Sequence, residues 1–171
     1  MENVILVDEQ DNEIGIAEKY ATHRLPVKLH RAFSIFIFNS KGEMLLARRA
    51  RSKYHWGGFW SNACCSHPRP SEPVDLATKR RLEEELGFTC DLRFLFKFIY
   101  RADFDGVWGE HELDYAYVGK YDGPVNPNPN EVEETRFMAI DDLKKDIEEN
   151  PEKYTPWFKI CLGRVLASKG M

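Results

Sequence analysis

The order of apolar and polar positions along the chain predicts strands over much of its length and the longer helices after residue 70. Apolar residues alternate with polar ones, or run together in short stretches, and turn-forming residues separate these stretches. The segment 30–39 is so dense in aromatic and β-branched residues that we expect a strand buried on both faces. Strands are predicted over residues 4–8, 13–17, 30–39, 44–48, 91–101, 110–119 and 133–139, with the first two and the next two forming hairpins.

Helical periodicity first becomes clear after residue 70. Leu76, Leu82 and Leu86 recur in helical phase, Ser71 is placed to cap the helix, and Gly87 is placed to end it. Further helical segments are predicted over residues 18–23, 141–149 and 157–168, whereas 54–70 and the proline-rich stretch 122–130 are expected to be loops. Strands and helices mixed in this way favour an α/β protein with a mixed sheet covered by helices.

The length and charge of the chain narrow the class of protein. We expect residues 1–171 to form a single domain, because 171 residues suffice for one well-formed core. The net charge of −4 disfavours nucleic acid and anionic lipid as partners, so an anionic substrate must meet a local basic patch. The apolar run Ala32–Phe38 is too short to cross a membrane, and no secretory leader precedes Val4. We therefore expect a cytoplasmic protein with reduced cysteines, present as a monomer or weak homodimer.

Histidines and carboxylates suggest a metal site. His23 and His30 flank a short connection that can bring both imidazoles together, and Glu110 and Glu112 lie two residues apart on a predicted strand, so they share a face. With His67, these side chains form a mixed nitrogen and oxygen set suited to Zn²⁺, Mn²⁺ or Fe²⁺. Any one of these histidines taken alone is more often a surface or capping residue. No role is assigned to His55 or His111.

A second group of reactive side chains lies just before the predicted helix. The octet 60–67 ends in Cys64-Cys65-Ser66-His67, and the helix carries the charged run 80–87. This region resembles the Nudix motif, with Ser66 in place of its leading glycine and Arg81 in place of a glutamate. The positions that match in order are Ser66, Glu72, Arg80, Arg81, Leu82, Glu84, Glu85, Gly87 and Phe88. Together with the cysteine segment, these departures are similar to type I isopentenyl-diphosphate isomerases, members of the Nudix superfamily.

The resemblance implies an α/β/α sandwich and a set of roles. The metal ligands implied are His23, His30, His67, Glu110 and Glu112 for a tightly bound Mn²⁺ or Zn²⁺, and Glu85 for a Mg²⁺ that accompanies the substrate diphosphate. Diphosphate contacts fall on Lys19, Arg49, Lys53 and Arg81, and the catalytic residues on Cys65, Glu112, Tyr100 and Trp157. The substrate implied is a small diphosphate, isopentenyl diphosphate, and the product is dimethylallyl diphosphate.

The chemistry of that reaction requires an acid and a base on opposite sides of the substrate, because protonating an alkene gives a tertiary carbocation. We expect Glu112 as the acid toward the alkene, tuned by Tyr100, with Cys65 as its partner at the other carbon. A nearby cation is expected to lower the pKa of Cys65. Trp157 would face the carbocation, an interaction of about 2 kcal/mol when desolvated.

Several alternatives compete with this interpretation. Arg81 lies four residues from Glu85, and Arg80 four from Glu84, so the helix could be a solvated surface with intrahelical ion pairs. A Nudix diphosphohydrolase would need a carboxylate at position 81, where this chain has an arginine. We expect Arg81 to lie on an exposed helix face and to contact phosphate. A non-catalytic metal- or nucleotide-binding domain would have lost several of these ionisable groups. Cys65 as a hydrolytic nucleophile lacks a Gly-rich elbow and a Cys-His-Asn order.

Overall fold

A computed structural model describes residues 2–168 and 170. Its sheet consists of β1 (Asn3–Val7), β2 (Glu13–Glu18), β3 (His30–Phe38), β4 (Met44–Arg49), β5 (Trp60–Ser61), β6 (Cys64–Ser66), β7 (Leu92–Asp103), β8 (Gly109–Lys120) and β9 (Val132–Met138). The helices are α1 (Lys19–His23), α2 (Val74–Leu86), α3 (Ile140–Glu149) and α4 (Pro156–Ser168), with a 3₁₀ turn at Pro151–Lys153. The strands and helices predicted from the sequence are all present, with small changes in their ends.

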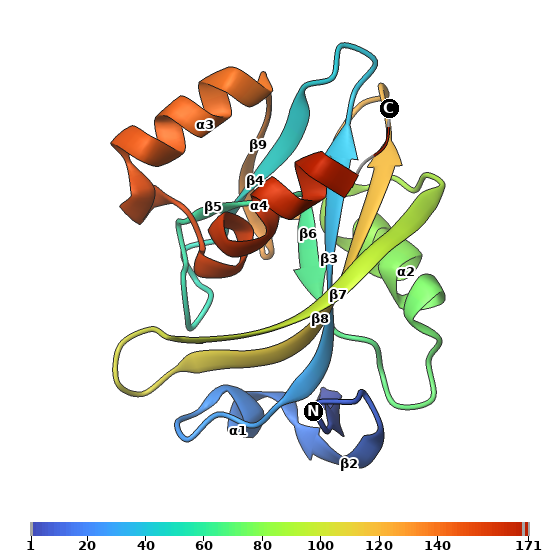
Figure 1. Ribbon diagram of the computed structural model, residues 1–171, viewed down its shortest axis with the longest axis vertical. Helices are drawn as coiled ribbons and strands as arrows, with labels where there is room; N and C mark the ends of the chain where they lie inside the picture. The colour runs from blue at the N-terminus through green and yellow to red at the C-terminus, as the bar shows by residue number, and fades with distance from the viewer. Residues whose placement is uncertain (1, 169, 171) are drawn as a thin grey trace.

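The central strand β3 explains the layered architecture. Residues Phe33, Ile35 and Ile37 point into a core shared with α2, whereas Phe36 and Phe38 point into a second core shared with α3 and α4. Figure 1 shows α4 in front of the sheet and α2 on the far side. The prediction that this strand is buried on both faces is confirmed, and the fold is the expected α/β/α sandwich.

Pairing between strands differs from the expected hairpins in one place. β1 and β2 pair antiparallel along their length, as predicted. β3 and β4 meet only through Phe38 and Met44 and then diverge, because β3 pairs in parallel along its whole length with β8 while β4 pairs with β9. The parallel pairing of β3 with β8 makes the sheet mixed, and it aligns His30 with Glu112.

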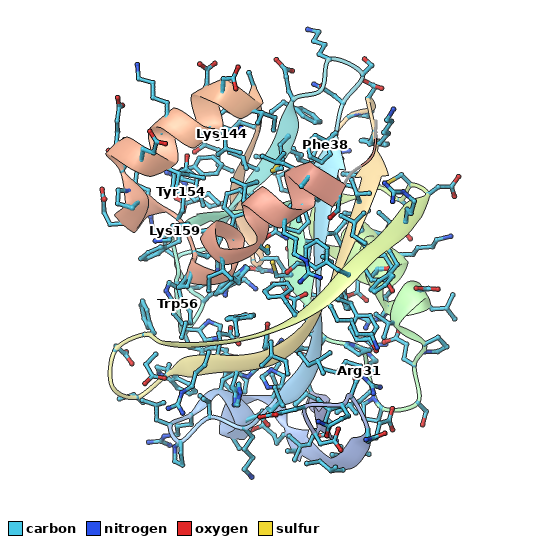
Figure 2. All side chains as sticks on the ribbon, viewed as in Figure 1. Arg31, Phe38, Trp56, Lys144, Tyr154 and Lys159 are labelled. Atoms are coloured by element: carbon cyan, nitrogen blue, oxygen red, sulfur yellow. The ribbon has the colours of Figure 1, made fainter. Side chains whose placement is uncertain are left out.

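The segment expected to be a loop over residues 54–70 contains two short strands. β5 pairs with β4, and β6 pairs with β3 so that Cys65 lies opposite Ser34. Pairing with distant strands, rather than local sequence, gives these residues their extended conformation. Trp56, in the loop before them, lies beside the long β7–β8 hairpin (Figure 2) and packs on Phe104 with ring centroids 5.0 Å apart.

Helix α2 begins and ends close to the predicted positions. Gly87 adopts φ +73° and its N–H bonds the Glu83 carbonyl, which confirms the predicted C-terminal stop. Ser71 does not cap the helix: the N-cap position is Pro73, and no side chain there accepts a hydrogen bond. Leu76 is exposed rather than buried, because α2 packs on the sheet through Leu82 and Leu86.

No helix in the described part of the chain is both long and apolar enough to span a membrane.

Candidate active site

The structure brings three histidines and two glutamates into one buried cluster. His23 ends α1, His30 opens β3, and His67 directly follows β6. The parallel register of β3 with β8 sets His30 beside Glu112, and the two-residue spacing along β8 turns Glu110 toward the same side. All five side chains are buried. Contacts between them place these five predicted metal ligands in one cluster.

The distances within this cluster are those of groups arranged around a common point. Oε1 of Glu112 lies 2.8 Å from Nε2 of His67, 3.3 Å from Nε2 of His30 and 3.8 Å from Nε2 of His23. Nε2 of His23 is 3.1 Å from Oε2 of Glu110, but neither atom makes a hydrogen bond with the described residues. Close polar atoms that are buried without hydrogen bonds fit a bound cation.

The other ring nitrogens of two of these histidines strengthen that reading. Nδ1 of His23 lies 2.7 Å from the Lys19 carbonyl, and Nδ1 of His30 lies 2.8 Å from the Lys28 carbonyl. A carbonyl only accepts hydrogen bonds, so each Nδ1 carries a proton, and in the neutral ring each Nε2 presents a lone pair to the cluster. The donor set therefore fits a divalent transition metal. One ligand atom each from His23, His30, His67 and Glu112 lies within 4.8 Å of the other three.

Electrostatics in the cluster favour the same conclusion. Burial opposes charge on His23, but the Glu110 and Glu112 carboxylates outweigh it and raise the pKa of His23 to about 10. Burial lowers the pKa of His67 to about 3. Burial also acts to raise the pKa of Glu110, yet His23 and His55 outweigh it and hold that pKa at about 2. Two buried carboxylates thus require positive charge, which a proton on His23 supplies in the free protein.

Cys65 lies in a second buried group, on the α4 side of β6. Nε1 of Trp157, at the start of α4, donates to Sγ of Cys65 at 3.1 Å and to Oγ of Ser61 at 3.0 Å. The thiol itself donates to Oδ1 of Asn62 at 3.1 Å. Tyr100 connects the two groups, because its hydroxyl donates to Oε2 of Glu112 at 2.6 Å and its ring centroid lies 6.2 Å from that of Trp157.

In the free protein the Cys65 thiol keeps its proton. Burial, and next the nearby Asp114 carboxylate, raise the pKa of this thiol to about 12. Sequence alone could not reveal Asp114 as a neighbour, because it lies on β8 and reaches Cys65 through Ser34. Oγ of Ser34 is 2.7 Å from Oδ2 of Asp114 and 3.5 Å from Sγ of Cys65. Cys64 points the other way into the α2 core, as expected of a small buried apolar residue.

The four predicted phosphate contacts all line the same pocket as Cys65 and Glu112. Three of them are already paired with carboxylates: Lys19 with Glu2 at 2.9 Å, Lys53 with Glu131, and Arg81 with several groups. Arg49 differs, since no carboxylate among the described residues lies within ion-pair distance of it. Its guanidinium instead lies 5.2 Å from the centroid of the Trp157 ring.

The expectation that Arg81 lies on an exposed helix face is wrong. Its side chain is only 12% exposed, and its guanidinium lies 2.7 Å from Glu84, 2.5 Å from Glu85 and 3.1 Å from Glu131. These carboxylates, acting against burial, raise the pKa of Arg81 still further. The i, i+4 pairing with Glu85 was expected, but Glu131 comes from the loop before β9 and its approach depends on tertiary structure. Glu85 is buried beneath this network.

Taken together, the pocket is lined by nearly all of the side chains singled out from the sequence, in addition to Tyr54, His55 and Ser66. The predicted residues among its walls are Lys19, His23, Arg49, Lys53, Cys65, His67, Arg81, Tyr100, Glu110, Glu112 and Trp157. His30 belongs to the histidine cluster behind the wall. Glu85 borders an adjoining cavity that also touches Arg49, Lys53 and Cys65.

One buried side chain of the pocket was set aside at the level of sequence. His55 is 5% exposed, and its Nε2 lies 2.9 Å from Oε1 of Glu110. The only sequence signal that could have singled it out is its position two residues after Lys53, in the segment that carries the predicted phosphate contacts.

The fold and the pocket together define a class of protein. Residues 28–158 match the family model of the NUDIX domain. The structure is similar to the crystal structure of DR0079 from Deinococcus radiodurans, with a TM-score of 0.72, 19% sequence identity, and coverage of 87% of this chain and 90% of that one. The chain therefore belongs to the Nudix family.

Sequence relatives specify the group within that family. The chain is 45% identical to "Isopentenyl-diphosphate Delta-isomerase 2" of Aromatoleum aromaticum over 99% of this chain and 89% of that protein. It is 48% identical to "Isopentenyl-diphosphate Delta-isomerase 1" of Photorhabdus laumondii over 93% of this chain and 92% of that protein. Within the Nudix family, the chain is a member of the isopentenyl-diphosphate Delta-isomerases, which confirms the resemblance drawn from its motifs.

Proposed function

We propose that this protein interconverts isopentenyl diphosphate and dimethylallyl diphosphate by adding a proton at one carbon of the substrate and removing one from another. The observation that carries the proposal is the pocket in which a half-buried thiol, a buried carboxylate and an aromatic wall meet four cationic side chains. A diphosphate needs the cations, and an allylic proton shift needs the two proton-transfer groups.

The cationic side of the pocket would bind the diphosphate. Arg49 has an unneutralised guanidinium, and its Nε has no hydrogen-bond partner among the described residues. Lys19, Lys53 and Arg81 would exchange part of their carboxylate contacts for phosphate oxygens. Arg81 also replaces the carboxylate that a hydrolytic metal cluster would use, which favours isomerisation over phosphate release.

Cys65 and Glu112 would be the proton-transfer pair. In the free protein, burial keeps the proton on the Cys65 thiol. At Glu112 the surrounding histidines outweigh burial and hold the pKa of the carboxyl well below its usual value, so the carboxylate is ionised. The pair therefore starts with one proton donor and one acceptor, in the opposite order to that favoured from the sequence. Tyr100 orients Glu112 by donating to Oε2 at 2.6 Å.

The aromatic wall would protect the cationic intermediate. Trp157 and Tyr100 are buried and line the pocket between Cys65 and Glu112. Their ring faces can stabilise positive charge, and their bulk keeps water away from the carbocation. The indole N–H of Trp157 is used in bonding Cys65 and Ser61, so the orientation of its ring is fixed.

We assign two divalent cations to this pocket, the first on the basis of the buried histidine and glutamate cluster. His23, His30, His67, Glu110 and Glu112 would hold one, Mn²⁺ or Zn²⁺, and Glu85 would hold Mg²⁺ together with the diphosphate. When bound, these ions would supply the positive charge that neutralises buried carboxylates and phosphate oxygens.

The proposal is tested by incubating the purified protein and Mg²⁺ with isopentenyl diphosphate in D₂O. We expect the allylic product, deuterium in both recovered diphosphates, and negligible phosphate release. Cys65→Ala should abolish turnover because it removes one proton-transfer group. Cys64→Ala is the matched control: Cys64 is 2% exposed and faces the other core, so turnover should change little. Phosphate release without an allylic product would overturn the proposal.

A further inference from the structure

His55 lies between the phosphate side and the carboxylate side of the pocket. Its Nδ1 is 3.2 Å from Nη2 of Arg49, and its Nε2 is 2.9 Å from Oε1 of Glu110. Arg49 also donates to the His55 carbonyl, at 3.3 Å. The imidazole is 5% exposed, so both contacts are shielded from water.

The partners of His55 determine which ring nitrogen carries the proton. A guanidinium can only donate hydrogen bonds, so Nδ1 of His55 must present its lone pair to Arg49. In a neutral ring the proton then lies on Nε2, which is 2.9 Å from Oε1 of Glu110 but makes no hydrogen bond with the described residues. This arrangement argues against a metal ion on Nε2, although the ligand atoms of His23, His55 and Glu110 all lie within 4.8 Å of one another.

Arg49 gains a partner in this way without losing its charge. Lys53 and Arg81 are both held by carboxylates, which compete with an incoming diphosphate. A neutral imidazole acceptor fixes the direction of the Arg49 guanidinium but leaves its positive charge available to an anion. The Trp157 ring, 5.2 Å from the guanidinium carbon, supports it from a second side.

Glu110 is held from two sides as well. Oε2 faces Nε2 of His23 at 3.1 Å, and Oε1 faces Nε2 of His55 at 2.9 Å. One oxygen thus points into the histidine cluster while the other is in contact with His55. Groups that contact a metal-binding carboxylate in this manner fix its orientation and strengthen metal binding.

We propose that His55 is a positioning residue that holds Arg49 toward the substrate diphosphate and Glu110 toward the metal. In this role His55 acts through Arg49 and Glu110 rather than by binding the substrate or the metal itself. This role rests on the proposed function, because it assigns the Arg49 side of the pocket to a diphosphate. It predicts two separate effects, one on the KM for isopentenyl diphosphate and one on metal affinity.

The experiment compares the parent protein with His55→Ala, His55→Gln and His111→Gln. Zn²⁺ affinity is measured by competition with a chelator. The visible absorption of the Co²⁺-loaded protein reports which residues bind the metal. KM and kcat are measured from the turnover of isopentenyl diphosphate. His111 lies between Glu110 and Glu112 on β8, but has no place in the cluster. His111→Gln should therefore match the parent.

For His55→Ala we expect about tenfold to hundredfold weaker Zn²⁺ binding, and about a tenfold rise in KM from the lost anchor of Arg49. The Co²⁺ absorption band should keep its position and intensity, because no ligand is removed. His55→Gln should recover most of the Zn²⁺ affinity and most of the parent KM, since its amide can accept a hydrogen bond from Arg49 and donate one to Glu110. Its similar size also keeps the test valid if the alanine variant fails to fold.

A changed Co²⁺ spectrum in both variants would make His55 a metal ligand and overturn the proposal. If the His55 variants have the same Zn²⁺ affinity and KM as His111→Gln, His55 is only a packing residue and the proposal is overturned. A parent that binds Zn²⁺ but does not isomerise would instead refute the proposed function, and the metal measurements would still decide how His55 acts on Glu110.

Discussion

At the scale of single residues, the pocket is a balance of buried charges rather than a basic patch. Three carboxylates surround Arg81, and Glu131 contacts Lys53 as well as Arg81. Burial is outweighed at Glu131 by these two cations, which lower its pKa to about 2. In the proposed complex, phosphate oxygens of the diphosphate would take the place of some of the carboxylate oxygens that now contact Arg81 and Lys53.

Arg81→Glu tests that balance. The substitution would place a fourth carboxylate among Glu84, Glu85 and Glu131. Glu85 would lose its cation, whereas Glu84 would keep Arg80 and Glu131 would keep Lys53. Since Arg81 is largely buried, we expect a loss of about 3 kcal/mol in the free energy of unfolding, together with about a tenfold to hundredfold rise in KM. Urea denaturation and steady-state kinetics measure the two effects.

Lys79→Glu supplies the control, because Lys79 is an exposed residue of the same helix. It makes the same change of charge outside the network, so its effect on unfolding should stay within about 0.5 kcal/mol. Equal, small losses in both variants would mean that the ion pairs around Arg81 contribute little to either stability or binding.

At the scale of elements, the C-terminal end of α2 is fixed by the loop that follows β8. The N–H groups of Asn126 and Asn128 donate to the Leu86 and Glu85 carbonyls, at 2.9 and 2.8 Å. The proline-rich stretch 122–130, expected as a surface loop, thus closes the end of the helix that carries Glu85. Gly87 permits this contact, because a Cβ there would lie 2.9 Å from the Asn126 carbonyl oxygen.

Gly87→Ala should therefore destabilise the protein more than a left-handed backbone alone requires. The left-handed conformation costs about 1–2 kcal/mol for a residue with a Cβ, and the clash with Asn126 adds to it. We expect at least about 2 kcal/mol in urea denaturation. Gly42→Ala is the matched comparison, since Gly42 has φ +78° but open space around its Cβ position. Equal losses at the two glycines would exclude a role for the Asn126 contact.

At the scale of the whole molecule, the histidine cluster joins parts of the chain that lie far apart in sequence. α1, β3, the residue after β6 and β8 each contribute a side chain. A cation bound there would connect all of these elements, so binding should be linked to global unfolding.

Melting temperature should accordingly rise with Zn²⁺ or Mn²⁺, by about 5 to 10 °C at one hundred times the dissociation constant. The pKa of His23 is about 10 in the free protein, so at lower pH a metal must displace its proton. Apparent affinity should therefore increase about tenfold for each pH unit between pH 6 and 8. Metal titrations followed by thermal unfolding at both pH values measure this.

Ca²⁺ is the comparison ion, because it prefers oxygen ligands and should raise the melting temperature little at a site rich in imidazole. A Zn²⁺ affinity that does not change between pH 6 and 8 would show that His23 does not carry a proton in the free protein.

Much of this protein could be predicted from its sequence because the relevant signals are local. Alternation and helical phase depend on neighbouring residues, so the strands other than β5 and β6, together with α2 and its stop at Gly87, were predictable. The spacing of Glu110 and Glu112 predicted their common face for the same reason. The resemblance to type I isopentenyl-diphosphate isomerases, drawn from the motif residues, implied Cys65 and most of the residues that line the pocket around it.

Tertiary structure alone decided what depends on long-range register and burial. The parallel pairing of β3 with β8 carries no local signal, yet it sets His30 against Glu112 and brings Asp114 within reach of Cys65 through Ser34. The pKa of a thiol depends on which groups surround it in space. His55 gained its place for the same reason, because only the folded chain shows that Arg49 and Glu110 approach its two ring nitrogens from opposite sides.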